Sequence, residues 1–233
     1  MIGFEDFPEF IETDERELID IENENIRHSI ILDGICEGAS ILDMGPCMCA
    51  SGAYALMHSA TYYEGVEIVP SFYENSLKNM KKYFTDDQYK IHNMLFLDYF
   101  DKYKDNFDIV LLMNMFYYVD DQRLFLEEVA KRARKYIVVE SPNISFEHDS
   151  DIPIVEYKTT MSVKSGKKKK DMTGIPRLTG LHGWCKCPNL AFFEMVLSQS
   201  GFKYFSDYEE MGTQHFPERY NEENRFLALF ERI

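Results

Sequence analysis

The chain has 233 residues, of which 45% are hydrophobic, enough for one sizeable core but too few for two independent domains. Its formal net charge of -15 makes nucleic acid an unfavourable partner, because an acidic surface repels polyanions unless a local basic patch intervenes. The N-terminus is acidic and interrupted by Pro8, unlike a signal peptide, and no stretch approaches about 18 apolar residues. We therefore expect a cytoplasmic protein with no membrane partner.

The first two thirds of the chain alternate between helical and strand patterns. Residues 15–35 have apolar side chains at helical spacing and are followed by Gly38, which predicts a leading amphipathic helix within an N-terminal cap, 1–37. Five apolar runs predict strands at 40–44, 62–69, 89–95, 107–114 and 135–141, and segments such as 70–84 and 121–135 between them can form helices. This alternation is typical of βαβ units in a parallel sheet covered on both faces.

The pattern changes after Pro142. Residues 144–188 are polar and rich in turn residues, and we interpret them as a lid or substrate insertion after the fifth strand rather than a second domain. A helix is predicted at 189–201, and two strands, "FKYFSDYEEM" and "NRFLALFERI", end the chain. We expect one domain spanning 1–233.

This order resembles the class I S-adenosylmethionine-dependent methyltransferases over nearly the whole chain, from about residue 15 to residue 233. The resemblance implies an α/β fold, a Rossmann-like three-layer sandwich with a seven-stranded, mostly parallel sheet that ends in an antiparallel hairpin. It also implies S-adenosylmethionine as cofactor and S-adenosylhomocysteine as product. A nicotinamide-binding Rossmann domain would more often continue with parallel units.

The segment "ILDMGPCMCASG", 41–52, is similar to the family's cofactor loop, with cysteine at two positions where glycine is usual. Asp43 and Gly45 match the acidic residue and the first glycine, and the resemblance adds Pro46 and Cys47 to the cofactor site. Cysteine is small, but it adopts positive φ less readily than glycine, so we expect the backbone to differ locally.

The two loop cysteines leave three interpretations open: a working cofactor loop, a thiol or metal site, or a decayed relic. A metal would need further ligands from Cys185, Cys187 or a histidine. We expect packed, unreactive thiols at Cys47 and Cys49 and no metal.

The ends of the other strands supply further cofactor candidates by the same resemblance. Glu67, 24 residues after Asp43, stands where the family places the side chain that binds the ribose hydroxyls, although an exposed strand-end glutamate is the simpler alternative. The remaining candidates line the adenine and methionine parts of the cofactor: Ile68, Asn93, Met94, Leu95, Asn114 and Met115. The adenine register is open between Asn93 with Met94 and Met94 with Leu95.

Candidates on the acceptor side lie in and beside the polar insertion. His182, His148 and Tyr118 are candidate catalytic residues, and Glu140 is a further candidate base. Substrate contacts are expected from Tyr117, Arg177 and Trp184, because a guanidinium binds carboxylate or phosphate and an indole forms a stacking wall. Each has an ordinary alternative as a solvated histidine, a packed aromatic or an anchor for the insertion.

We expect O-methylation of a small polar or anionic metabolite or sugar derivative. An RNA-modifying methyltransferase is one alternative, because the Trp184 segment is similar to the group containing tRNA wobble-uridine methyltransferases and because five of the residues from Lys164 to Lys170 are lysine. A catalytically inactive, methyltransferase-like binding protein is another. The lysine run is interpreted either as a solvated loop or as a segment that closes over an anionic acceptor.

Overall fold

The computed structural model describes residues 3–11, 21–116, 119–142, 155–159, 184–207 and 225–233. Its helices are η1 (Pro8–Phe10), α1 (Ile21–Leu32), α2 (Ala50–Met57), α3 (Pro70–Tyr83), α4 (Phe96–Lys102), α5 (Gln122–Arg132) and α6 (Leu190–Gln199). Its strands are β1 (Ser40–Met44), β2 (Tyr62–Val66), β3 (Tyr89–His92), β4 (Phe107–Met113), β5 (Ala133–Pro142), β6 (Val155–Thr159), β7 (Trp184–Pro188), β8 (Phe202–Asp207) and β9 (Arg225–Arg232).

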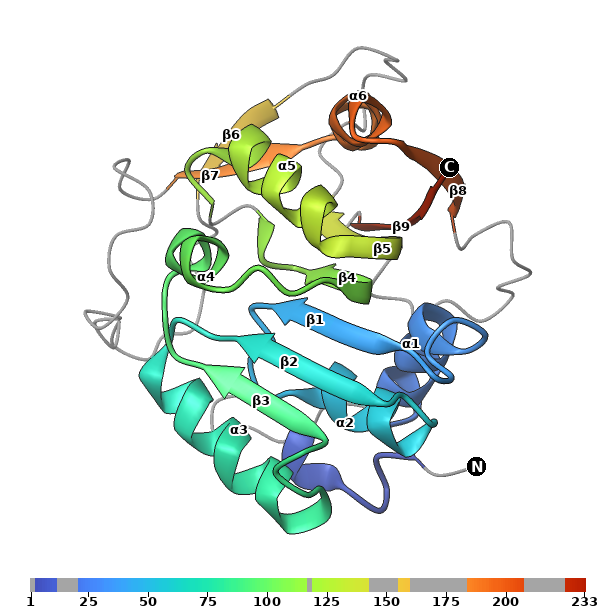
Figure 1. Ribbon diagram of the computed structural model, residues 1–233, viewed down its shortest axis with the longest axis vertical. Helices are drawn as coiled ribbons and strands as arrows, with labels where there is room; N and C mark the ends of the chain where they lie inside the picture. The colour runs from blue at the N-terminus through green and yellow to red at the C-terminus, as the bar shows by residue number, and fades with distance from the viewer. Residues whose placement is uncertain (1–2, 12–20, 117–118, 143–154, 160–183, 208–224) are drawn as a thin grey trace.

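Seven strands form one sheet in the order β3-β2-β1-β4-β5-β9-β8 (Figure 1). The first five pair in parallel, with Asp43 of β1 lying between Gly65 of β2 and Leu111 of β4. The last strand of the chain, β9, runs antiparallel to both β5 and β8. The predicted seven-stranded, mostly parallel sheet with a terminal antiparallel hairpin is confirmed.

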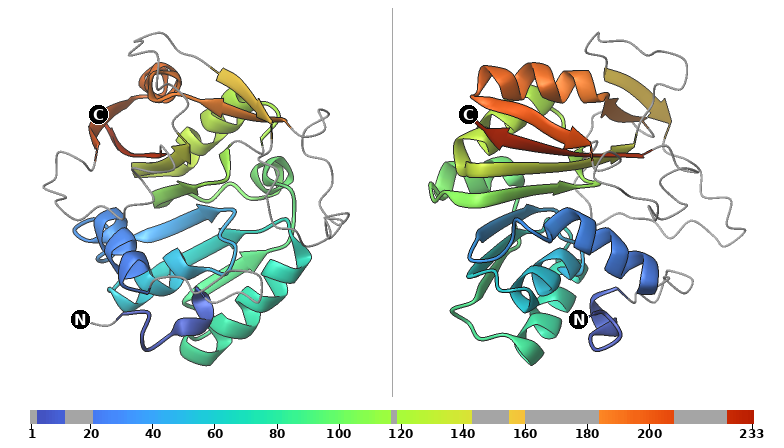
Figure 2. Two further views of the ribbon diagram at one scale, coloured as in Figure 1. Left: turned by 180° about the vertical axis from the view of Figure 1, so that it is seen from behind. Right: turned by 90° about the vertical axis from the view of Figure 1, so that its right-hand side faces the viewer.

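Helices cover both faces of the sheet. One apolar cluster joins α1, α2 and α3 to the sheet through residues such as Ile31, Ala53 and Met80. A second joins α4, α5 and α6 to the opposite face. Figure 1 shows α3 beside β2 and β3, and α5 and α6 at the other end of the molecule, and Figure 2 shows the same layers from behind and from the side. The strands alternate between the clusters, with Leu42 in one and Ile41 in the other, because successive side chains point to opposite faces.

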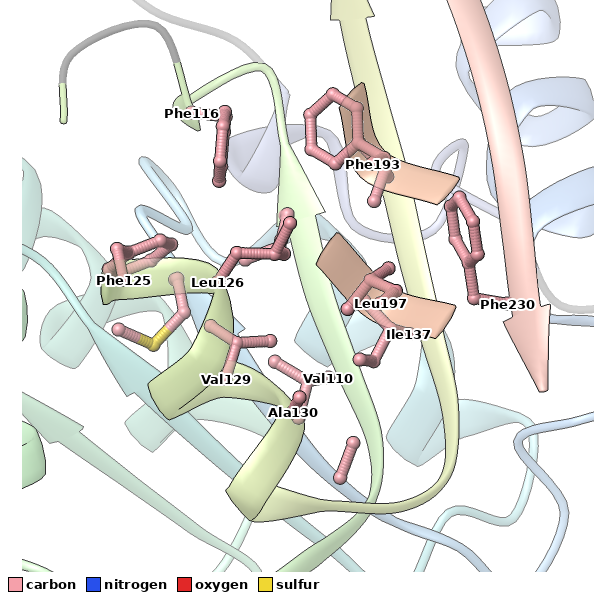
Figure 3. Close-up of a cluster of buried hydrophobic side chains, with 14 of the residues drawn as sticks. Val110, Phe116, Phe125, Leu126, Val129, Ala130, Ile137, Phe193, Leu197 and Phe230 are labelled. Atoms are coloured by element: carbon pink, nitrogen blue, oxygen red, sulfur yellow. The ribbon is translucent and has the colours of Figure 1, made fainter. Parts of the chain in front are cut away.

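The core on the α5 and α6 face is built around large aromatic rings. Phe116 lies with its ring centroid 4.7 Å from that of Phe193 and 5.8 Å from that of Phe125. Figure 3 shows the side chains that surround these rings, from α5, α6 and three strands: Val110, Leu126, Val129, Ala130, Ile137, Leu197 and Phe230. Since Phe116 directly precedes residues 117–118, this packing holds the chain in place just after β4.

Local sequence signals explain several helix boundaries. α3 begins with Pro70, whose missing N–H is not needed at a first helical position. The side chain of Asp121 accepts a hydrogen bond from the backbone N–H of Leu124 at the start of α5, and Asn189 does the same for Phe192 at the start of α6. None of the helices in the described ranges is long and apolar enough to cross a membrane.

The helices α2 and α4 follow β1 and β3, in agreement with the predicted alternation of strands and helices. The structure also contains an element that the sequence pattern did not predict. It is a separate two-stranded antiparallel sheet, β6 and β7, in which Val155 pairs with Pro188 and Thr159 with Trp184. It lies within the predicted insertion 144–188, the rest of which lies outside the described residues.

Candidate functional site

The candidate site lies at the carboxyl edge of the parallel strands, where β1 and β4 are neighbours although they are not consecutive in the chain. In open α/β sheets this switch of strand order is where ligands bind, because the loops after the two strands turn in opposite directions. The residues expected to bind a cofactor lie at or just after the strand ends on this edge: Asp43, Gly45, Pro46, Cys47, Glu67, Ile68, Asn93, Met94, Leu95, Asn114 and Met115.

Gly45 is required at its position by both conformation and space. Its φ is +79°, in the left-handed region that glycine adopts without strain. A Cβ at residue 45 would lie 3.0 Å from the Cβ of Met115, and the N–H of Gly45 donates to the carbonyl of Val66 at 2.9 Å. The loop after β1 is thereby held close to the end of β2 and to the segment after β4.

Cys47 and Cys49 adopt φ values of +54° and +62°. The expectation that they would force a different local backbone is therefore wrong: the chain keeps a left-handed, glycine-like path with cysteine side chains on it. Each left-handed residue costs about 1–2 kcal/mol. The surrounding hydrogen bonds hold the loop in place, with the N–H of Cys47 donating to Glu67 Oε2 at 2.9 Å and Ser76 Oγ donating to the carbonyl of Cys47 at 2.7 Å.

The two thiols differ in burial. Cys49 is fully buried, and burial raises the pKa of its thiol to about 12, so it stays protonated and unreactive. Cys47 is half-buried. Within the described ranges no group of three or more His, Cys, Asp and Glu side chains could hold a metal ion. The side chains of Cys185 and Cys187 are not among those that the structure describes.

Asp43 carries a buried carboxylate that is only partly satisfied. It is 1% exposed, and Oδ2 accepts a hydrogen bond from the hydroxyl of Tyr63 at 3.1 Å. Oδ1 is buried with no hydrogen-bond partner among the described residues. Burial raises the pKa of Asp43 to about 7, although Tyr63 and the charge of Arg27 act to lower it. An unpaired buried carboxylate oxygen is a strong acceptor for a cationic ligand group.

Glu67 follows directly after β2, as predicted, and it is buried rather than exposed. Its Oε2 accepts from the N–H of Cys47, and its Oε1 accepts from the N–H of Val69 at 2.8 Å. Burial raises the pKa of Glu67, and these backbone bonds act against that rise. Since a carboxylate oxygen can accept more than one hydrogen bond, this rigid pair of oxygens can still receive the two hydroxyls of a diol.

Asn93 connects the ends of two strands. Its side-chain amide donates to the carbonyl of Glu67 at 2.8 Å and to that of Ile68 at 3.2 Å. Met94 is partly buried against the core, whereas Leu95, which precedes α4, exposes 39% of its surface. An exposed leucine beside a polar amide gives a surface on which a flat apolar ring can lie.

Asn114 is the first residue after β4 and has an unusual backbone. Its φ is +57°, and its N–H donates to the carbonyl of Glu140 at 2.9 Å. Its Oδ1 is buried without a partner in the described part of the chain. Asparagine tolerates the left-handed region better than most residues, and such outliers concentrate at ligand sites. Met115 is buried against Gly45.

The structure brings an ion-pair group to this edge that sequence reasoning missed. Arg27 of α1 donates from both Nε and Nη2 to Glu140 Oε2 and from Nη1 to Glu24 Oε2 at 3.3 Å. Glu140, considered above as a base, is therefore the ion-pair partner of Arg27. Arg27 lies one helical turn before the buried Ile31, and this placement on the apolar side of α1 was the available sequence signal.

His28, next to Arg27, is completely buried. One ring nitrogen lies 2.8 Å from the carbonyl of Glu24 and the other 3.3 Å from Ser51 Oγ. Burial and the neighbouring charge of Arg27 lower the pKa of His28 to about 4, so it is neutral at physiological pH and joins α1 to α2.

The acceptor-side candidates are not tested by this geometry. Tyr117, Tyr118, His148, Arg177 and His182 lie outside the described residues. The backbone of Trp184 is in β7, paired with Thr159, but its side chain lies outside the description as well.

No protein-family model matches the chain, and no curated protein sequence matches it. Solved structures do. An S-adenosylmethionine-dependent methyltransferase from Mesorhizobium loti is 14% identical, with 90% of this chain and 98% of that chain covered and a TM-score of 0.58. The N-terminal domain of EvdMO1, crystallised in the presence of S-adenosylhomocysteine and D-fucose, is 15% identical over 95% and 89% of the two chains, with a TM-score of 0.62.

A third similar structure is the 1,6-didemethyltoxoflavin-N1-methyltransferase of Burkholderia thailandensis, with its bound substrate and S-adenosylhomocysteine. It is 9% identical over 90% of this chain and 78% of that chain, with a TM-score of 0.62. At such identities the similarity establishes the fold. The chain has the Rossmann-like fold of the class I S-adenosylmethionine-dependent methyltransferases, which confirms the fold implied by the sequence resemblance.

Proposed function

We propose that this chain is an S-adenosylmethionine-dependent methyltransferase that transfers a methyl group to an oxygen of a small polar or anionic metabolite or sugar derivative. One observation carries the proposal: at the β1/β4 switch point, Asp43 presents a buried carboxylate oxygen that has no hydrogen-bond partner in the described part of the chain. It lies beside a left-handed loop that is hydrogen-bonded to Glu67. Such a pair of acidic side chains can bind an amino-acid-bearing nucleoside, one accepting from its ammonium and one from its ribose diol.

The residues present fit this cofactor. Asp43 Oδ1 would accept the ammonium, and the oxygens of Glu67, held by two backbone N–H groups, would accept the ribose hydroxyls. Adenine would lie on Met94 and Leu95 with Asn93 at its edge. The methionine part would lie along Asn114 and Met115, and the loop residues Gly45, Pro46, Cys47 and Ile68 would line the remainder.

Bound S-adenosylmethionine supplies a sulfonium methyl group that is already activated, and S-adenosylhomocysteine is the product. The protein's contribution is therefore to align the acceptor and, for a hydroxyl, to remove its proton. We assign proton removal to His182, His148 or Tyr118. We assign acceptor contacts to Tyr117, Arg177 and Trp184, with Arg177 as the group that would pair with an anionic substituent.

Two facts support a small acceptor. The net charge of -15 disfavours a polyanionic one. Of the similar structures, the 1,6-didemethyltoxoflavin-N1-methyltransferase holds bound 1,6-didemethyltoxoflavin, and the EvdMO1 domain was crystallised in the presence of D-fucose. We propose a small-molecule acceptor for this chain on the same grounds.

Ligand binding tests the cofactor half of the proposal. S-adenosylhomocysteine at about 100 times its dissociation constant should stabilise the native state by about 2.7 kcal/mol in a thermal-shift experiment, and adenosine should do so far less. No shift with either S-adenosylmethionine or S-adenosylhomocysteine would refute the proposal.

Methyl transfer tests the acceptor half. Radiolabelled S-adenosylmethionine is incubated with the protein and either a small-metabolite extract or total RNA, at low and at moderate salt. Label in the small-molecule fraction supports the proposal, whereas label in RNA that declines with salt supports an RNA-modifying enzyme. Cofactor binding with no transfer to either fraction would indicate a binding protein.

A further inference from the structure

Tyr63 is the second residue of β2, and its hydroxyl reaches the carboxylate of the proposed cofactor site. The hydroxyl donates to Asp43 Oδ2 at 3.1 Å, across the pair of neighbouring strands β1 and β2. Both side chains are buried. The bond occupies one oxygen of Asp43 and leaves Oδ1 as the oxygen without a partner in the described ranges.

Two glycines make room for the Tyr63 ring. A Cβ on Gly52 of α2 would lie 2.4 Å from Cζ of Tyr63, closer than any two such atoms can approach. A Cβ on Gly65 would lie 3.3 Å from the Tyr63 hydroxyl. Any larger residue at position 52 would displace the ring, so the glycine in "CASG" serves the placement of this tyrosine.

Four titratable groups among the described residues influence the charge of Asp43 or are influenced by it. They are Tyr63 of β2, Cys49 just before α2, Arg27 of α1 and Glu67 just after β2. Burial raises the pKa of the Tyr63 hydroxyl well above its ordinary value, and the nearby Asp43 raises it further, so Tyr63 remains a hydrogen-bond donor. Tyr63 and Arg27 favour the ionised form of Asp43, whereas burial and Glu67 oppose it.

We infer that Tyr63 is a positioning residue for the cofactor: its hydroxyl holds Oδ2 and so orients the Asp43 carboxylate with Oδ1 toward the cofactor's ammonium. This inference rests on the proposed function. It gives Tyr63 a role in cofactor binding that acts through Asp43 and involves no contact of its own with the cofactor. Because a protonated Asp43 cannot pair with an ammonium, cofactor affinity rises with pH through the Asp43 titration. Tyr63 sets where that rise occurs.

The test is calorimetric titration with S-adenosylhomocysteine between pH 5.5 and 8.0, using the wild type and Tyr63→Phe. The phenylalanine keeps the ring between the two glycines and removes only the hydroxyl. Losing a hydrogen bond to a charged group should move the pH midpoint for binding upward by about one unit. The variant should bind about 10-fold more weakly at pH 6 and within about threefold of wild type at pH 8.

Tyr62→Phe is the matched control. Tyr62 is the neighbouring residue on the same strand, and its hydroxyl donates to the carboxylate of Glu64 at 3.0 Å, in a group that does not include Asp43. This variant loses a tyrosine–carboxylate bond of the same kind, yet its midpoint should equal that of wild type.

The outcomes separate this inference from the proposed function. If the wild type does not bind the ligand at any pH, the proposed function fails and the inference fails with it. If the wild type binds and the midpoints of wild type and Tyr63→Phe agree, the function stands and the positioning role is refuted. A shift of the same size in Tyr62→Phe would also refute it, since the effect would then be a general result of losing a tyrosine–carboxylate hydrogen bond.

Discussion

Replacing Asp43 by asparagine should make the ligand-free protein more stable at alkaline pH relative to wild type. Asp43 is buried, and its pKa in the folded protein is about 7, against an ordinary value of 3.8. The folded state therefore binds a proton that the unfolded state has released at any pH between these values. The wild type consequently loses stability as pH rises from about 4 to about 7.

The size of the effect follows from the two pKa values. A rise of about three units corresponds to about 4 kcal/mol of destabilisation above pH 7, of which about 2 kcal/mol develops between pH 5.5 and pH 8. The amide of asparagine does not titrate. Its oxygen can still accept from Tyr63, and its buried NH₂ costs about 1–3 kcal/mol at every pH. Only the pH-dependent part of the stability difference between Asp43→Asn and wild type therefore reports on the titration of Asp43.

Urea unfolding of ligand-free wild type and Asp43→Asn at pH 5.5 and pH 8 measures this part. The free energy of unfolding of the variant, minus that of wild type, should rise by about 2 kcal/mol between the two pH values. Asp108→Asn is the control, because hydrogen bonds from Ser40 help to lower the pKa of Asp108 and its carboxylate is ionised in both states over this range. Equal differences for Asp43→Asn at both pH values would refute the idea of a buried, proton-binding carboxylate.

Substitutions at three further positions test the site and its surroundings. Glu67→Ala should weaken binding of S-adenosylhomocysteine by about 1–3 kcal/mol through lost hydrogen bonds to the ribose, and equal calorimetric affinities for wild type and variant would remove Glu67 from the site. Arg27→Ala removes a guanidinium that pairs with the buried Glu140 and should destabilise the fold by about 3–5 kcal/mol. Arg123→Ala, which breaks an exposed pair with Glu127, should cost less than about 1 kcal/mol. Similar losses for the two variants in urea unfolding would contradict this account. Cys47→Gly should be more stable than Cys47→Ala by about 0.5–1 kcal/mol because residue 47 has positive φ, and the opposite order of thermal midpoints would show that the loop is not strained there.

The amino-acid pattern alone predicts the strands that build the sheet of this protein. Runs such as "SILDM" and "FDIVLLM" predict buried strands because continuous apolar character is required in a sheet covered on both faces. The order of these strands and the antiparallel ending followed from the family resemblance. Asp43 and Glu67 lie at the carboxyl ends of two predicted strands that are consecutive in the chain. Because such strands pair in parallel, the two side chains could be expected at the same edge of the sheet.

Other features of the site depend on contacts between residues that are distant in the chain, and no local sequence pattern predicts those contacts. The backbone at Cys47 and Cys49 keeps positive φ because Glu67 and Ser76, 20 and 29 residues after Cys47, hold it with hydrogen bonds that local propensity does not include. Arg27 is paired with Glu140, which is 113 residues away. The role proposed for Tyr63 likewise depends on its hydrogen bond to Asp43, 20 residues earlier, and on the space that Gly52 of α2 leaves for its ring. Local sequence determines which conformation each segment prefers, whereas burial and long-range packing determine which carboxylate oxygen has no hydrogen-bond partner among the described residues. The proposed cofactor site depends on that oxygen.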